Sequence, residues 1–526
     1  MVNQVEFSAL SDDTQEYLLR NVDHHLSIMN IFCTYNVLWG LARMGVSTAY
    51  LGPNLSSALL DKAVNVLHTF LPTQYGDIIW SLGTLGYSKS DLSPVMSDRL
   101  LAVLSRVYGK LHVRAAAYTL WGLSKMGFQW DDMRVRTRSL AGGREADPLS
   151  ESVCKYLRQR VASMKEHEYS VLLYSLGGLG AQLQDHPDHS LPSYVTDKIH
   201  HRATRVSTFL TSRSLANSIY GLGKCGVRWI KLPAETRQAW QDAMLRPSPT
   251  TTTLPSGGAK GRDSGGDRRG LAGMKIVEFT QTLYGLGQMQ VPWKSLSYNA
   301  REAILREIEV PGKVDCMDLH GLSSGLWGLA TMGCSLNDIP VPLLAAARSR
   351  LWALGTDMDV STSTLDASHG DAQTSLLSHT TTELDELFET DGRINSNAQG
   401  SSTITGSDTM QHRGSKRIVR RGTLTSIEEA GLSLSMGLEA MGKLGVLLTV
   451  EEQREISIYL QVLAAQMGSD SIVGCTAGLS QLGILWSDLS LDTRVTWIAT
   501  LKKVPGELST VKRQILAESL SAMKAF

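Results

Sequence analysis

The sequence lacks the features that mark a disulfide-bonded, membrane-spanning or catalytic protein. Its six cysteines include no C-x-x-C pair, so we expect reduced thiols in a reducing compartment, with Cys225 and Cys475 buried beside apolar positions. No apolar run approaches the roughly 18–20 residues that span a bilayer. No serine elbow, H-E-x-x-H or nucleophile with a plausible base stands out. We therefore expect no enzyme, no metal and no cofactor.

The chain also lacks net charge, since 51 basic side chains balance 51 acidic ones. The balance is uneven, because residues 99–246 hold 22 basic and 12 acidic side chains, a local charge of +10. Such a block either binds a polyanion through its positive charge or consists of helix faces that are exposed to solvent. Four acidic residues precede the first basic one, Arg20, whereas a transit peptide is rich in arginine. Either there is no presequence or it lies outside this numbering.

What the sequence has in quantity is one repeated phrase. In its third copy an aromatic ring, Trp121, is followed by Gly122, Leu123, two variable residues, Met126 and Gly127. We call the place of Trp121 the ring position and count the other places from it. The ring positions are Trp39, Trp80, Trp121, Tyr174, Tyr220, Tyr284 and Trp327, with weaker copies at Glu439, Ala477 and Glu518. Their successive spacings are 41, 41, 53, 46, 64, 43, 112, 38 and 41. The shorter spacings give a repeat length of about 40 residues, and the longer ones reflect insertions. This length suits a repeat array.

A period of this length fits two short helices and two turns, a helical hairpin. In the third repeat, the apolar residues predict a first helix from about Val113 to Met126. The glycine six places after the ring predicts a left-handed helix end. Gln290 and Lys524 are the only residues that replace it. A second helix follows, for example from Ser97 to Val107. We therefore predict an all-α solenoid of nine to ten hairpins.

Insertions divide the array. We expect repeats 1–5 in residues 1–246, repeats 6–7 in 274–354 and repeats 8–10 in 423–526. A short Gly-rich loop, 141–150, extends the third repeat. The Pro/Thr/Gly-rich segment 247–273 and the Ser/Thr/Asp-rich segment 355–422 are predicted to be disordered. The spacing of 112 around the second segment leaves room for one degenerate repeat, but no motif is visible there.

Two motifs resemble nucleotide-binding loops. Gly221, Gly223 and Gly226 match G-x-G-x-x-G, and residues 437–443 read GLEAMGK. The first motif requires a strand before it and a helix after it. Here both motifs lie inside the helical repeat phrase, so we interpret them as structure. His186 and His189, in a polar loop, remain a weak candidate for a surface metal site.

The ring positions themselves favour packing between successive hairpins over stacking on bases. A second set of positions is more informative. Three places before the ring, one place after it and four places after it are spaced i, i+4, i+7 on a helix and share one face. The residue three places before the ring is polar in several repeats. The residue one place after the ring is small, and the residue four places after it is often basic or an amide. Such a face could read base edges and bind phosphate, with the small residue as a gap for the ligand. Equally, the small residue could let a neighbouring helix pack closely.

If this face binds RNA, two groups of contacts are expected. The first group follows the shared face of repeats 1–6: Asn36, Arg43, Asp77, Tyr118, Lys125, Asn217, Lys224, Gln281 and Gln288. The second group comes from the basic block: Arg134, Arg136, Arg138, Arg158, Arg160, Arg202 and Arg205.

The phrase LWGL-x-x-M-G, followed by a turn with tryptophan and a Leu-rich helix, resembles the octotricopeptide repeat and the related heptatricopeptide repeat of apicomplexan parasites. The segment VPWKSL, residues 291–296, is closest to the Pro-Pro-x-x-Trp turn of the latter family. The resemblance covers roughly residue 28 to the C-terminus apart from the insertions. The turn proline is mostly absent here, and the period is nearer 40 than 37 residues.

The resemblance implies an α-solenoid that binds single-stranded RNA in mitochondria or plastids. Its roles would be RNA maturation, stability, translation or ribosome assembly, without catalysis, since no endonuclease-like C-terminal domain is visible. Neutral net charge suits short contacts with ribosomal RNA fragments among other proteins of a ribonucleoprotein particle, such as a mitochondrial ribosome. We expect no membrane and no small-molecule substrate. The alternative is a scaffold solenoid that binds a helix or tail of a protein partner.

Overall fold

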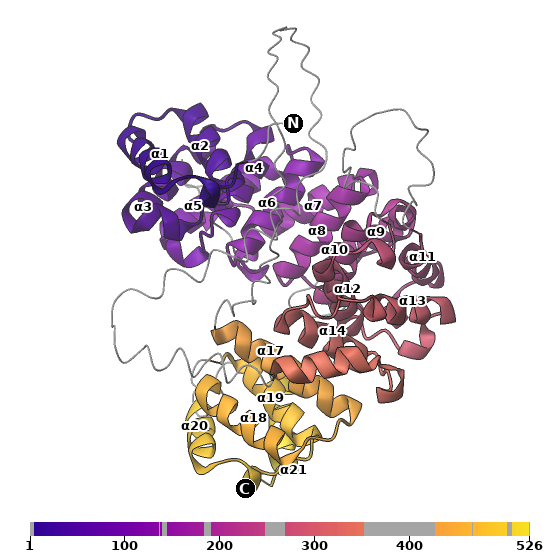
Figure 1. Cartoon of the computed structure of the whole chain (residues 1–526). Helices are drawn as coiled ribbons and strands as arrows, with labels where there is room; N and C mark the ends of the chain where they lie inside the picture. Colours follow the sequence, from indigo (N-terminus) through magenta and orange to yellow (C-terminus); the bar gives the residue numbers. More distant parts are fainter. Residues whose placement is uncertain are drawn as a thin grey trace, which may run out of the picture.

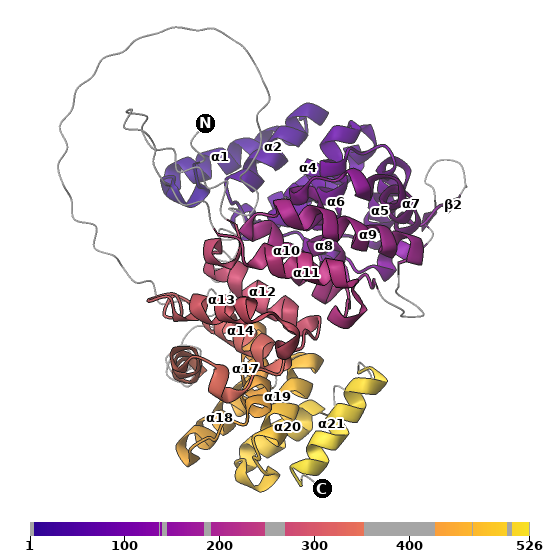
Figure 2. The same ribbon diagram turned by 90° about the vertical axis from the view of Figure 1, so that its right-hand side faces the viewer.

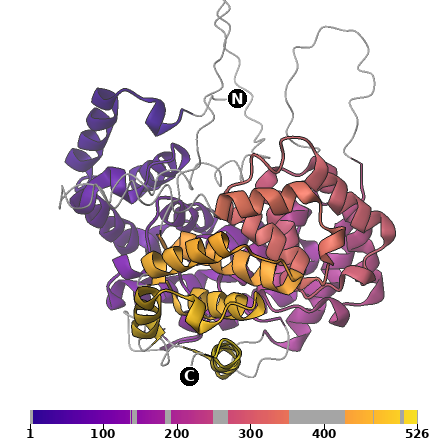
Figure 3. The ribbon, with the colours of Figure 1, turned by 60° about the horizontal axis from the view of Figure 1, so that its bottom comes forward.

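A computed structural model of the chain describes residues 5–135, 137–138, 145–183, 191–247, 269–351, 427–464, 467–501 and 508–524. It confirms the predicted all-α solenoid. Helical hairpins follow one another from the first helices at the upper left of Figure 1, through the magenta repeats, to the C-terminal helices at the bottom. With the C-terminal helices forward (Figure 3), the first repeats and repeats 6 and 7 lie on opposite sides of them. The row of hairpins therefore winds rather than running straight.

The first helix of each hairpin belongs to an inner row, in which every helix packs against the next. The inner row consists of α2 (Ile31–Arg43), α4 (Pro72–Thr84), α6 (Val113–Lys125), α8 (Glu166–Gly178), α10 (Ser212–Lys224), α12 (Ile276–Gln288), α14 (Leu319–Thr331), α17 (Ile427–Leu444), α19 (Ser469–Gln481) and α21 (Thr510–Ala522). Each of the ten ring positions lies in one of these helices. The repeat phrase therefore forms the inner helix, as the sequence predicts.

The second helices form an outer row, which lies on the right-hand side of Figure 1 at α9, α11 and α13. The outer row consists of α1 (Asp12–His25), α3 (Thr48–Val66), α5 (Pro94–Tyr108), α7 (Leu149–Arg160), α9 (Ser193–Val206), α11 (Ala234–Met244), α13 (Tyr298–Glu309), residues 341–351, α18 (Val450–Leu463) and α20 (Leu491–Leu501). Leucines two places after the ring, such as Leu123 and Leu222, are fully buried. The core therefore lies between the two rows.

Short 3₁₀ helices form the connections between the longer helices. Those after inner helices are Lys89–Asp91, Asp131–Arg134, Trp229–Lys231, Trp293–Ser295, Leu336–Asp338 and Trp486–Asp488. The others are Phe7–Ala9, Leu67–Thr69, Val161–Ser163, Ser207–Phe209 and Leu271–Gly273. A two-stranded antiparallel ribbon, β1 (Thr137–Arg138) with β2 (Glu145–Ala146), precedes α7. The predicted Gly-rich loop is therefore shorter than expected, because β2 and the start of α7 take up its second half.

Every inner helix ends in the same way. Six places after each of the ten ring positions, the backbone has a positive φ, between 51° and 86°. Gly127 shows the expected left-handed helix end with φ 78°. Gln290 and Lys524 adopt the same conformation, with φ 51° and 54°, although they carry side chains. The position requires a tight reversal into the turn, and glycine meets it with the least strain.

A main-chain hydrogen bond joins successive repeats at this reversal. The residue nine places after one ring donates its N–H to the carbonyl five places after the next ring. The N–O distance is 2.6 Å from Lys89 to Met126 and from Trp130 to Leu179, and 2.8 Å from Trp229 to Met289. The same bond joins Thr48 to Leu85, Leu183 to Cys225, Trp293 to Met332 and Trp486 to Met523. These bonds fix the register of successive hairpins from repeat 1 to repeat 7 and of repeat 9 on repeat 10.

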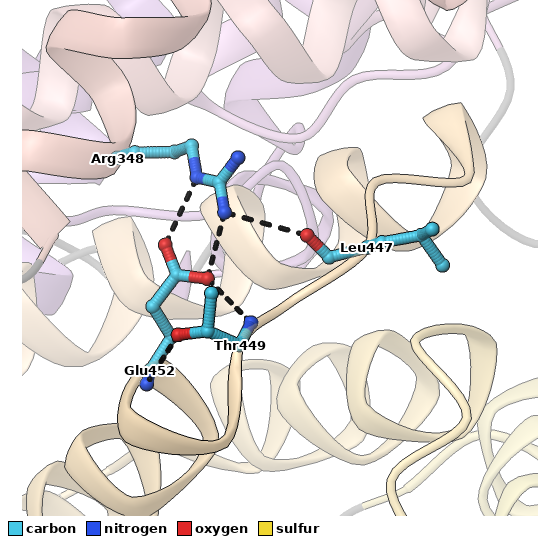
Figure 4. Close-up of polar contacts among 4 residues, drawn as sticks. All are labelled: Arg348, Leu447, Thr449 and Glu452. Atoms are coloured by element: carbon cyan, nitrogen blue, oxygen red, sulfur yellow. Dashed lines mark hydrogen bonds and ion pairs between the residues drawn. The ribbon is translucent and has the colours of Figure 1, made fainter.

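Repeats 7 and 8 are direct neighbours although 75 residues, 352–426, lie between the described segments. Helix α14 packs on α17 in the same way as other successive inner helices pack on one another. Figure 4 shows Arg348, from residues 341–351, donating Nε and Nη2 to the two carboxylate oxygens of Glu452 at 3.0 and 2.7 Å, while Nη2 also reaches the Leu447 carbonyl. Among the described residues, no further repeat stands between these two. Residues 248–268 and 352–426, which include most of both predicted disordered segments, lie outside the described residues.

Candidate nucleic-acid interface

The ring residues form a ladder along one face of the inner row. Ring centroids are 6.3 Å apart between Trp80 and Trp121 and 5.4 Å between Tyr174 and Tyr220, and both pairs are stacked. The ladder continues from Tyr220 to Tyr284 at 5.8 Å and on to Trp327 at 5.1 Å. Trp80 and Trp121 are buried, and the later rings are half-buried. The prediction that the rings pack successive hairpins together is confirmed for these pairs.

Cations lie over this ladder from the position four places after the ring. Lys125 Nζ is 5.5 Å from the Trp121 ring, and Lys224 Nζ is 5.8 and 5.4 Å from the rings of Tyr220 and Tyr284. Lys443 Nζ is 5.3 Å from the Trp327 ring. At the amino end, Arg43 Cζ lies 5.7 Å from the Trp39 ring. Cation–π attraction holds these charges over the rings and therefore in a row on the inner face.

The small residue after the ring packs against the preceding inner helix, so of the two alternatives left open by the sequence, close packing is confirmed and the gap for a ligand is wrong. A β-carbon on Gly221 would lie 2.6 Å from the backbone nitrogen of Tyr174, and one on Gly285 would lie 2.8 Å from the Ile219 carbonyl carbon. One place along a helix is a rotation of 100°, which turns this position from the inner face toward the preceding inner helix. The small residue permits close helix packing.

The positions three places before the ring divide into exposed and buried ones. Asn36 is exposed, Asp77 and Gln281 are half-buried, and Tyr118 and Asn217 are only 5% and 8% exposed. Of the positions four places after the ring, Arg43, Lys125, Lys224 and Gln288 are partly exposed. Gln288 Nε2 donates to Tyr284 Oη at 2.9 Å. The structure thus places the predicted cations on one face. Of the predicted residues three places before the ring, Tyr118 and Asn217 are buried.

A polar cluster crosses the first four inner helices. Tyr35 Oη donates to Asp77 Oδ2 at 3.0 Å, and burial, followed by the charge of Asp77, raises the pKa of Tyr35 to about 12. Burial also raises the pKa of Asp77, although the Tyr35 hydrogen bond and the charge of Arg114 oppose that change. Arg114 Cζ lies 5.1 Å from the Tyr118 ring, and Tyr118 Oη lies 3.4 Å from His167 Nε2.

Three members of this inner face were missed from the sequence. Arg114, His167 and Arg213 each stand seven places before a ring, which is two helical turns away on the same face. Arg114 is exposed, and His167 and Arg213 are partly exposed. The i, i+7 spacing was available in the sequence and could have found them.

The predicted arginines of the basic block do not join the inner face. Arg158, Arg160, Arg202 and Arg205 belong to α7 and α9 of the outer row. Arg158 Cζ lies 5.2 Å from the Tyr194 ring, and Arg202 Nη2 donates to the Met164 carbonyl, so both contribute to packing. Arg134, in a turn, pairs with Asp131 at 3.6 Å. Arg136 and the side chain of Arg138 lie outside the described residues.

The nucleotide-like motifs are structural, as predicted. Gly221 and Gly223 lie within α10, and a β-carbon on Gly223 would meet the Gly285 carbonyl at 2.7 Å. Residues 437–443 lie within α17. His186 and His189 lie outside the described residues. Among the described residues, no group of three or more potential ligands could hold a metal ion, and no helix is long and apolar enough to cross a membrane. Cys225, Cys475, Cys154 and Cys334 are buried, and Cys33 and Cys316 are exposed.

The protein is an all-α solenoid of helical hairpins. Its inner face carries basic side chains that lie over a ladder of aromatic rings. No model of a protein family matches the chain, and no curated protein matches it significantly.

Proposed function

We propose that the inner face binds single-stranded RNA without catalysis. The observation that carries this proposal is the row of cations held over the ring ladder, Lys125 and Lys224 in particular, with Arg114 and Arg213 two or more turns away on the same helices. Lysine and arginine bind phosphate, whereas the amides of the exposed Asn36 and the partly exposed Gln288 can contact base edges. The rings serve to position the cations.

The cellular setting follows from the family resemblance and rests on it. We propose an organellar protein of the mitochondrion, or alternatively the plastid, that acts in RNA maturation or stability or as a component of the mitochondrial ribosome. Its partners would be single-stranded RNA or ribosomal RNA fragments and other proteins of a ribonucleoprotein particle. The alternative, a scaffold for a protein helix or tail, would favour an apolar inner face, whereas the contacts of repeats 3, 5 and 8 place lysines there.

A salt titration tests the proposal. The double variant Lys125→Gln, Lys224→Gln removes two inner charges, and Arg158→Gln, Arg205→Gln removes two outer charges as a matched control. For two lost phosphate contacts, the slope of log K against log salt on a single-stranded RNA should flatten by about 1.4. The Kd should rise for the inner variant and change little for the outer one. An unchanged Kd and slope for the inner variant would reject the proposal, and a larger effect of the outer variant would move the interface to α7 and α9.

A further inference from the structure

Helix α4 of the second repeat differs from its neighbours in the charge that it presents. Helices α2, α4 and α6 lie side by side in the inner row (Figure 2). Arg43 of α2 and Lys125 of α6 lie over the rings of their own helices, on either side of α4. At the same place α4 has the buried Thr84, and three places before its ring it has the half-buried Asp77. The second repeat therefore presents a carboxylate on a face to which its neighbours contribute cations.

The carboxylate of Asp77 is held in place but not neutralised. Tyr35 Oη of α2 donates to Asp77 Oδ2 at 3.0 Å. Within the described part of the chain this is the only hydrogen bond to the carboxylate, and no cation lies within ion-pair distance of it. Oδ1 is therefore without a donor, and it is not fully buried. Burial raises the pKa of Asp77, so its negative charge opposes folding. A group that weakens the fold in this way is typical of a functional position.

The cations near Asp77 indicate which part of an RNA strand would meet it. Arg114 stands four residues before the level of Asp77 and Lys125 seven residues after it, roughly 6 and 10 Å along the helix axis. These three positions fall within about 40° of one another around a helix, so the side chains share the inner face. A strand whose phosphates bind the cations is repelled by a carboxylate at its backbone, so the group that meets Asp77 is a base. This step rests on the proposed binding of RNA.

The four bases differ in the donors that they offer to a carboxylate. Guanine has two adjacent donors on its Watson–Crick edge, N1–H and the N2 amino group, which match the two oxygens of one carboxylate. Oδ2 accepts the Tyr35 proton with one lone pair and keeps another, so Asp77 can still accept both bonds. Adenine and cytosine have one amino donor beside a ring-nitrogen acceptor, and uracil has one N–H between two carbonyl oxygens. In those bases an acceptor faces the second carboxylate oxygen, which disfavours the contact.

We propose that Asp77 is a guanine-specificity residue of the inner face and that Tyr35 positions its carboxylate. The two carboxylate oxygens accept N1–H and N2–H of an unstacked guanine, while the neighbouring cations bind phosphates of the same strand. The second repeat then selects one base in a strand that the cations bind without regard to sequence. The inner face thereby gains a sequence preference that phosphate contacts alone do not provide.

Binding of short RNAs that differ in one base tests the assignment. The probes are fluorescent oligouridines of equal length with guanosine, inosine, adenosine, cytidine or uridine at the centre, and anisotropy with the full chain measures each Kd. The parent should bind the guanosine RNA about tenfold more tightly than the uridine RNA, which is within the range of one bidentate contact to a base. Inosine keeps N1–H but lacks the N2 amino group, so its RNA should bind with an intermediate Kd.

Variants of the chain connect the preference to the carboxylate. Asp77→Asn should fold, since the charge that it removes opposes folding, and should abolish the preference, because an amide has one oxygen acceptor in place of two. Its Kd for the uridine RNA should stay the same or fall. Asp98→Asn removes an exposed carboxylate from α5 of the outer row and, as the matched control, should keep the preference. Tyr35→Phe removes the hydrogen bond that orients the carboxylate, and it should reduce the guanosine preference with little change in the Kd for the uridine RNA.

Three results would overturn the proposal: equal Kd values for guanosine and uridine RNA in the parent, a stronger preference for adenosine or cytidine, or an unchanged preference in Asp77→Asn. In each of these cases salt-dependent binding of every RNA would still support the proposed function, so the two failures are distinguishable. Binding of none of the RNAs would reject both.

Discussion

The backbone of Gly122 lies directly against that of Trp80, so that a β-carbon on Gly122 would be 2.8 Å from the Trp80 nitrogen. This contact brings α4 and α6 close enough for the rings of Trp80 and Trp121 to stack at 6.3 Å. The same relationship recurs where Gly221 meets α8 and Gly285 meets α10. Where glycine follows the ring and packs on the preceding helix, at Gly122, Gly221, Gly285, Gly328 and Gly478, the closeness of the inner helices therefore depends on the absence of one carbon atom.

Replacing Gly122 with alanine should destabilise the fold despite the higher helix propensity of alanine. Overpacking against backbone that cannot move aside should lower the free energy of unfolding by about 1–3 kcal/mol or more. Gly40→Ala is the matched control at the same repeat position, where the open space should allow a gain of up to about 1 kcal/mol from propensity. Denaturant titration followed by circular dichroism measures both, and equal effects would disprove the packing role.

The turn hydrogen bonds predict a specific effect of proline at Lys89. Lys89→Pro removes the N–H that bonds the Met126 carbonyl, and leaving that acceptor unpaired should cost about 1–3 kcal/mol. Lys89→Ala keeps the N–H and loses the partly exposed ion pair to Asp132 and the cation–π contact with Phe128, losses that Lys89→Pro shares and that should each cost about 1 kcal/mol or less. The two melting temperatures should therefore differ, and similar values would show that the bond adds little.

The contact of repeats 7 and 8 predicts that the fold tolerates loss of residues 355–422. Because α14 packs on α17 and Arg348 binds Glu452 with two hydrogen bonds, a flexible linker in place of this segment should leave the melting temperature nearly unchanged. Arg348→Lys, which cannot bind both oxygens in the same geometry, should lower it in either background. Separate melting of the two halves in the shortened chain would contradict direct packing.

Asp77 predicts a pH effect. Burial raises its pKa above the ordinary 3.8, so the folded state disfavours the ionised carboxylate. Stability from this group is therefore greatest below pH 3.8 and is lost as the pH rises through the raised value. Asp77→Asn keeps an oxygen acceptor for Tyr35 and removes the charge. The variant should melt at a higher temperature than the parent at neutral pH, and the difference should vanish at low pH; a lower melting temperature at pH 7 would show that the charge stabilises the fold.

Thiol accessibility gives a further check of the fold. Burial raises the pKa of the Cys154 thiol to about 11 and that of Cys334 to about 12, which keeps both protonated at neutral pH. Native protein treated with iodoacetamide at pH 8 should therefore be modified at Cys33 and Cys316, with the other four thiols protected. In denaturant all six should react. Rapid native modification of Cys225 or Cys475 would contradict their burial.

The sequence alone determined the kind of fold and the parts of each hairpin. The period near 40 residues, the buried leucines and the glycine after the helix depend only on local helical geometry, so Val113–Lys125 and the left-handed Gly127 followed directly. Which side of an inner helix meets its neighbour was decided by the tertiary structure. A helical period fixes the angle between Gly122 and Lys125 but not the direction in which either points. The sequence therefore left a ligand gap and a packing contact at Gly122 as equal alternatives, and the structure shows the packing contact.

The tertiary structure also decided which distant residues meet. The outer-row arginines lie apart from the inner face, and Arg348 reaches Glu452 across the large insertion. These relationships depend on how hairpins stack. Stacking is set by close contacts between backbones and by hydrogen bonds between turns. The recurring small residue after the ring marks the close contacts, but it does not say which distant side chains they bring together.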